Sequence, residues 1–188
     1  MRNASVRLIA ALVFVSAIPV AATPCPLPTT DVSAAVLRAA GPARLTTTRR
    51  TDPDSHEPII RTIADFADGS TVILEQQNCV IENTRLTLLS PGAEPSEVQV
   101  RRAGRILGAV PMWRRHYAGR DAETMLLAET RSPQFRALAK APGAIYAIDS
   151  RFEARKAATE ALIGFVQSDS PAVVYKGQLA FYLGIGGH

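Results

Sequence analysis

Residues 59–75 read IIRTIADFADGSTVILE, and this stretch decides the fold. Two runs rich in apolar residues, 59–67 and 70–75, flank the dipeptide Asp68-Gly69. Aspartate and glycine tolerate the positive φ angles that a tight turn between antiparallel strands requires. The stretch therefore predicts a β-hairpin, and with it an antiparallel sheet.

Further strands are indicated on both sides of the hairpin. The threonine-rich residues 45–51 and the residues 80–89 have compositions typical of strands. In residues 179–185 a leucine, phenylalanine or isoleucine occupies every second position, which is the period of a strand that buries one side. We expect this last strand to join the earlier sheet.

Helices are expected before and after the sheet region. A short helix over residues 30–40 has Thr30 or Asp31 as its cap and ends at Gly41-Pro42. In residues 100–110 the apolar side chains recur at spacings of three and four, a helical period that should stop or kink at Pro111. Three more helices are predicted, one after Asp121, one from Ser132 to Lys140, and the longest from Ser150 to about Val166.

This order of elements predicts an α+β fold in a single domain. An N-terminal helix precedes an antiparallel sheet of about four strands, a helical second half follows, and a C-terminal strand completes the sheet. With 47% apolar and 20% charged residues among 188, the composition is that of a folded chain rather than a disordered one.

The first 22 residues have the parts of a secretory signal peptide. Arg2 and Arg7 provide a positive start, an apolar run covers residues 8–18, and small residues precede a cleavage position after Ala22. The apolar run is short for a bilayer core of about 30 Å, which disfavours a membrane anchor. We therefore expect residues 23–188 to form an exported domain, soluble and periplasmic or secreted.

The two cysteines are expected to pair, because an exported chain meets an oxidising compartment. A bond between Cys25 and Cys79 would close a loop of about 55 residues and stabilise the fold by roughly 4 kcal/mol on the chain-entropy model. The alternative is a catalytic Cys79 thiol with His116 as its base, which no flanking pattern supports.

The sequence contains few of the motifs that mark catalytic, metal or nucleotide sites. His56-Glu57 lacks the second histidine of a zinc-protease helix, and the residues around Asp52 and Asp54 lack the glycine of a calcium loop. No P-loop, nucleophile elbow or dinucleotide turn occurs. A carboxylate pair such as Glu75 with Glu82 stays open for acid–base chemistry. We expect no catalytic residue, no metal and no cofactor.

A basic segment over residues 98–120 is the most distinctive feature of the second half. It contains no acidic residue, and arginines accumulate in it beside aromatic side chains. Arginine binds carboxylates and phosphates through two hydrogen bonds, and tryptophan and tyrosine are frequent where interfaces gain most of their affinity. The candidate partner-binding residues are Arg101, Arg102, Arg105, Trp113, Arg114, Arg115, Tyr117 and Arg120. The alternative is a solvated helix face whose arginines pair with neighbouring acids such as Glu97 and Glu123.

In general terms, a leader, one disulfide, a compact α+β domain and no catalytic set resemble exported inhibitors and immunity proteins. The likeness implies a non-catalytic periplasmic binding protein that uses the basic segment to engage an acidic protein partner. The alternatives are an envelope-associated accessory protein that contacts anionic lipid or glycan, and an unrecognised hydrolase. Nucleic acid is disfavoured, because an exported protein seldom meets it.

Overall fold

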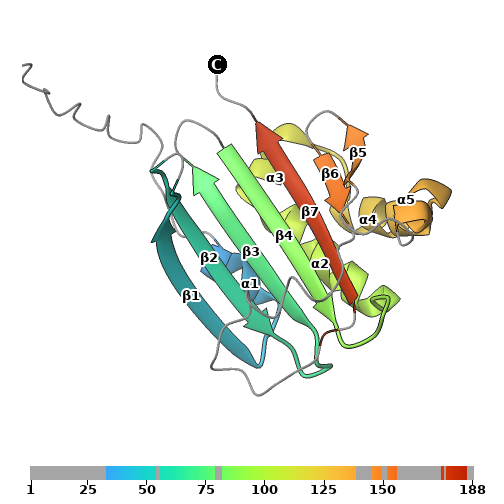
Figure 1. Cartoon of the computed structure of the whole chain (residues 1–188), viewed down its shortest axis with the longest axis horizontal. Coiled ribbons are helices and arrows are strands. Elements are labelled where there is room, and N and C mark those ends of the chain that lie inside the picture. Colours follow the sequence, from blue (N-terminus) through green and yellow to red (C-terminus); the bar gives the residue numbers. More distant parts are fainter. Residues whose placement is uncertain are drawn as a thin grey trace, which may run out of the picture.

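The computed structural model describes residues 33–53, 56–78, 82–138, 145–149, 152–155, 175 and 177–185 of the chain. These residues form an α+β fold in which helices pack against one face of an antiparallel sheet (Figure 1). The predicted fold class is thus confirmed.

Among the described residues the sheet has seven strands in the order β1-β2-β3-β4-β7-β6-β5, and all neighbours run antiparallel. The strands are β1 (Arg44–Thr51), β2 (Pro58–Asp65), β3 (Thr71–Asn78), β4 (Glu82–Ser90), β5 (Ile145–Asp149), β6 (Phe152–Arg155) and β7 (Gly177–Ile185). The C-terminal strand β7 lies between β4 and β6, so the prediction that it joins the earlier sheet is confirmed (Figure 1).

The hairpin between β2 and β3 forms where the sequence predicts it. Gly69 has a φ of 77°, and the Phe66 amide donates to the Ser70 carbonyl oxygen at 2.9 Å. The Asp68 carboxylate accepts from both the amide and the hydroxyl of Ser70, at 3.1 and 2.6 Å. The positive φ of Gly69 and the hydrogen bonds from Ser70 to the Asp68 side chain define the turn, and the turn fixes the register of the two strands.

Five helices are described: α1 (Ser33–Ala39), α2 (Glu97–Ala109), α3 (Pro111–His116), α4 (Ala122–Arg131) and α5 (Pro133–Leu138). The predicted break at Pro111 separates α2 from α3. Asp121 caps α4, because its carboxylate accepts from the amides of Glu123 and Thr124. Ser132 caps α5 in the same way through the Phe135 amide, at 3.1 Å.

The main core lies between these helices and one face of the sheet. Leu74, Leu86 and Phe181 come from three adjacent strands and are fully buried in it. Leu107 of α2 and Leu126 of α4 meet them from the helix side. In Figure 1 α1 lies behind β2 and β3, α2 and α3 lie behind β4 and β7, and α4 is seen to the right of β7, next to α5.

The opposite face of the sheet carries a second, smaller cluster and a row of charges. Ile73 and Leu89 are buried there with Tyr175, whose hydroxyl is hydrogen-bonded to that of Thr71. Burial raises the pKa of the Tyr175 phenol. Beside this cluster Glu75 is in contact with three arginines, with Arg61 as the nearest at 2.6 Å and Arg50 and Arg85 farther away.

The predicted helix from Ser150 to Val166 is wrong at its start. Residues 152–155 form strand β6, in which Phe152 and Ala154 lie opposite Leu183 and Phe181 of β7. Pairing with an existing strand decided the conformation, and a four-residue segment is too short to show its period of two. Strand β5 was not anticipated either. The remainder of the predicted helix lies outside the described residues.

The leader, Cys25 and Cys79 also lie outside the described residues, so cleavage and the disulfide stay predictions. Within the part of the chain that the structure describes, no helix is both long and apolar enough to cross a membrane.

Candidate binding groove and cavity

The structure divides the six arginines of the basic segment into three pairs, according to their acidic partners. Arg101 of α2 bonds Glu97 one turn before it at 2.6 Å and reaches Glu123 of α4 at 2.9 Å. Arg105 contacts the other oxygen of Glu123 at 3.4 Å. These pairs connect α2 to α4. Arg101 thus fits the alternative in which the arginines lie on a solvated helix face and pair with neighbouring acids.

Arg102 and Arg115 connect the helices to the sheet. Arg102 bonds Asp68 in the β2–β3 turn at 3.0 Å, and its guanidinium lies 4.1 Å from the centre of the Phe66 ring. Arg115 is paired with Glu82 at the start of β4. Both arginines have their acids far away in the sequence, so neighbouring residues alone did not reveal these pairs.

The contact between Arg102 and Asp68 makes stability depend on pH. Burial alone raises the pKa of the Asp68 carboxyl, but hydrogen bonds from Arg102 and Ser70 outweigh burial and lower the pKa from 3.8 to about 2. A carboxyl with a lowered folded-state pKa stabilises the fold above its unfolded-state pKa, and this contribution is lost as the pH falls through the folded-state value.

We therefore expect Asp68→Asn to cost about 1 kcal/mol of unfolding free energy at pH 6, after allowance for solvent screening, and almost nothing at pH 2. Urea unfolding at the two pH values measures the difference. Glu129→Gln is the control, because Glu129 has no ion pair among the described residues. A cost for Asp68→Asn that is equal at both pH values would contradict the role of the ionised carboxylate.

The two aromatic residues of the basic segment are buried, with 2% of Trp113 and 3% of Tyr117 exposed. Their rings stack with centroids 4.5 Å apart and 16° between the planes. The Trp113 indole N–H donates to the Arg120 carbonyl oxygen at 3.2 Å. These rings belong to the core and hold the loop after α3, so they expose little area to a partner.

The remaining two arginines, together with Arg105, border a groove of about 490 Å³ between α2, α3 and the start of α4. We call it the arginine groove, and Arg105, Arg114 and Arg120 lie along its rim. Its lining also includes Gly104, Gly108, Ala109, Trp113, Tyr117, Ala118, Gly119, Asp121 and Ala122. Arg114 and Arg120 have no acidic partner among the described residues, and the Arg120 guanidinium lies 5.8 Å from the Tyr117 ring centre.

Asp121 is the acid nearest to these arginines in sequence, but its carboxylate is directed to the N-terminus of α4. Hydrogen bonds from the Thr124 hydroxyl and amide lower the pKa of Asp121. The Asp121 carboxylate therefore stays ionised, but it is one acid beside the three arginines of the lining, so the arginine groove keeps a net positive charge.

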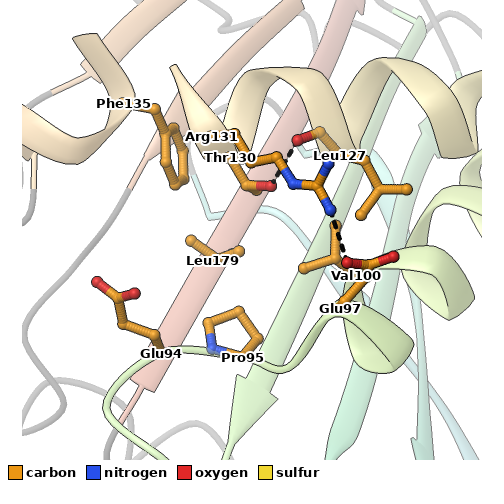
Figure 2. Close-up of a pocket in the computed structure, with 9 residues that line it drawn as sticks. All are labelled: Glu94, Pro95, Glu97, Val100, Leu127, Thr130, Arg131, Phe135 and Leu179. Carbon is orange, nitrogen blue, oxygen red and sulfur yellow. Dashed lines mark hydrogen bonds and ion pairs between the residues drawn. The ribbon is translucent and has the colours of Figure 1, made fainter. Parts of the chain in front are cut away.

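A separate cavity of about 440 Å³ lies at the other end of the α2 and α4 pair (Figure 2). Val100, Leu127, Phe135 and Leu179 are buried side chains that form its apolar lining. Glu94, Pro95, Glu97, Thr130 and Arg131 complete the lining. Figure 2 shows the Arg131 guanidinium reaching from α4 to the Glu97 carboxylate of α2, a contact of 2.6 Å. Arg131 lies outside the predicted basic segment, and no local pattern marked it.

The carboxylate pair that the sequence left open does not form. Glu75 of β3 lies opposite Arg85, and Glu82 of β4 lies opposite Asn78. Because residues 75 and 78 are an odd number of positions apart in one strand, the two glutamates project from opposite faces of the sheet. Within the described residues no three metal-binding side chains gather either.

Comparisons of the chain with protein-family models, with curated proteins and with solved structures give no match.

Proposed function

We propose that this chain is a non-catalytic binding protein that engages an acidic protein partner through the arginine groove. One observation carries the proposal: Arg105, Arg114 and Arg120 converge on one concave surface, and Arg114 and Arg120 have no acidic partner among the described residues. Guanidinium groups held around a concavity can bind a carboxylate through paired hydrogen bonds.

The local structure supports such a role, because the groove is built on a packed base. Trp113 and Tyr117 are buried under α3 and its following loop, and the indole bonds the backbone of Arg120. A rigid backbone reduces the conformational entropy that is lost on binding. The arginine side chains extend from this base toward solvent, where they can steer an acidic surface into contact.

The predicted export of the chain places the proposed interaction in the periplasm or outside the cell. An exported chain with one domain and a basic groove fits an inhibitor or immunity protein that blocks an acidic protein in the periplasm. An accessory protein that holds anionic lipid or glycan uses the same groove chemistry, and the experiment separates the two.

We expect the double variant Arg114→Glu/Arg120→Glu to lose its acidic protein partner while its melting temperature stays within about 2 °C of the original, since surface substitutions change stability little. Three immobilised baits are compared in periplasmic and secreted fractions: the original chain, the double variant, and the control Arg49→Glu. Arg49 is an exposed arginine of β1, away from the groove. Bound proteins are identified by mass spectrometry.

One stoichiometric acidic protein, retained by the original chain and the control but lost by the double variant, supports the proposal. Retention by all three baits would rule out the groove. If no protein is retained and the original chain binds vesicles containing phosphatidylglycerol with a steep salt dependence, the lipid alternative replaces the protein partner.

A further inference from the structure

The cavity shown in Figure 2 is a second candidate site, and its chemistry differs from that of the arginine groove. It lies between α2, α4, α5 and β7, with buried apolar side chains from all four elements around it. Its volume of about 440 Å³ lies within the range of about 300–1,000 Å³ that is usual for small-molecule sites.

The interior of the cavity can hold an apolar group. Val100, Leu127, Phe135 and Leu179 are each 8% exposed or less, yet they line the open space. The Thr130 hydroxyl donates to the Leu127 carbonyl oxygen at 3.2 Å, so this polar group on the wall already has a partner. An apolar chain that enters the cavity would remove hydrocarbon surface from water. It would not leave the Thr130 hydroxyl without a hydrogen-bond partner.

The rim of the cavity carries Arg131, whose positive charge can bind an anionic group of a ligand. Arg131 is 61% exposed and is bonded to Glu97 at 2.6 Å. Glu97 is also bonded to Arg101 at 2.6 Å, and hydrogen bonds and charge from the two arginines, those of Arg101 first, lower the pKa of Glu97. If Arg131 binds a ligand in place of Glu97, Glu97 keeps its ion pair with Arg101. The exchange of partners by Arg131 therefore costs little free energy.

We propose that this cavity binds a monocarboxylate with an apolar body of medium size, such as a medium-chain fatty acid. The apolar body fills the space between Val100, Leu127 and Leu179, and the carboxylate takes the place of Glu97 as the partner of Arg131. A ligand cation is disfavoured because Glu97 has two guanidinium partners already. A second negative charge on the ligand is disfavoured by Glu94 and Glu97 on the rim.

Octanoate and 1-octanol are suitable probes, since they share the apolar chain and differ in the charged group. Each is titrated into the full chain below its micellar concentration, and the methyl resonances of valine and leucine are followed by NMR. We expect saturable shifts with both probes and nuclear Overhauser contacts from the octanoate chain to methyl groups of Val100, Leu127 and Leu179.

The variant Arg131→Gln should weaken octanoate about fivefold, as expected for one exposed ion pair, and change the dissociation constant of 1-octanol less than about twofold. Arg49→Gln is the control, because Arg49 of β1 is also an exposed arginine but lies outside both the cavity and the arginine groove. It should leave both dissociation constants unchanged.

Absence of saturable shifts with both probes would overturn the site. Binding of 1-octanol without octanoate, or an equal effect of Arg131→Gln and Arg49→Gln, would overturn the assignment of a carboxylate to Arg131. The inference does not rest on the proposed function, since loss of the protein partner from the arginine groove leaves the octanoate titration unaffected.

Discussion

Replacing Trp113 by alanine is expected to lower the free energy of unfolding by about 3–5 kcal/mol, which is usual for deletion of a fully buried indole. The side chain is 2% exposed, it stacks on Tyr117, and its N–H bonds the Arg120 carbonyl oxygen. Alanine would leave a cavity beneath α3 and remove the hydrogen bond that holds the loop after it.

Urea unfolding followed by circular dichroism measures this loss of unfolding free energy. Two further variants separate the contribution of the indole N–H and serve as a surface control. Trp113→Phe keeps most of the apolar volume but loses the N–H, so it should cost about 1–3 kcal/mol. Arg114→Ala alters the exposed neighbour and should change the unfolding free energy by no more than about 0.5 kcal/mol. If Trp113→Ala proved as stable as the original chain, the indole would be a surface contact residue, as its place in the basic segment suggested.

The second large effect is expected at Gly104, where α2 crosses α4. A methyl group there would lie 2.5 Å from the Glu123 Cα, and 3.0 and 3.1 Å from the Glu123 amide nitrogen and the Ala122 carbonyl oxygen. Because backbone cannot rotate away as a side chain can, the two helices would have to separate. Overpacking of this kind costs typically about 1–3 kcal/mol, and the better helix propensity of alanine returns at most about 1 kcal/mol.

We therefore expect Gly104→Ala to be destabilised by up to about 2 kcal/mol and Gly104→Val by more. Gly108→Ala is the matched control on the same helix, where the added methyl meets only the Ala122 side chain at 3.3 Å. Its unfolding free energy should stay within about 1 kcal/mol of the original. Thermal unfolding measures the three variants together, and equal melting temperatures for Gly104→Ala and Gly108→Ala would contradict a close crossing at Gly104.

The close approach at Gly104 also relates the two candidate sites to each other. The arginine groove lies at the end of α2 and the start of α4, whereas the cavity lies at the start of α2 and the end of α4. One helix pair therefore supports both sites. Separation of α2 from α4 in Gly104→Val should weaken octanoate binding as well as capture of the protein partner.

Local chemistry made several elements predictable from the sequence. Asp68-Gly69 defines the hairpin because its backbone angles suit few other residues, and Pro111 separates α2 from α3 because it cannot continue a helix. Asp121 marks the start of α4, since its carboxylate can bond the free amides of the first turn. Each of these signals acts over a few residues, and each is confirmed by the structure.

The candidate site was predictable only in part. An arginine-rich segment without acids is visible in the sequence, but the acids that neutralise Arg102 and Arg115 come from the turn after β2 and from β4. Of the other four arginines, Arg101 pairs with Glu97 and Glu123. The remaining three line the groove, and they are Arg105, Arg114 and Arg120. The periodicity of the segment also did not separate buried Trp113 from its exposed neighbour Arg114.

The sequence by itself determined the α+β class, the hairpin, the helix boundaries at Asp121 and Pro111, and the addition of the last strand to the sheet. Only the tertiary structure decided that residues 152–155 form a strand, that Trp113 and Tyr117 are core, and that Glu97 and Arg131 meet at the mouth of a cavity. The physical reason is range: turns and caps depend on the angles and hydrogen bonds of adjacent residues, whereas strand pairing, burial and ion pairs between elements depend on residues that only folding brings together.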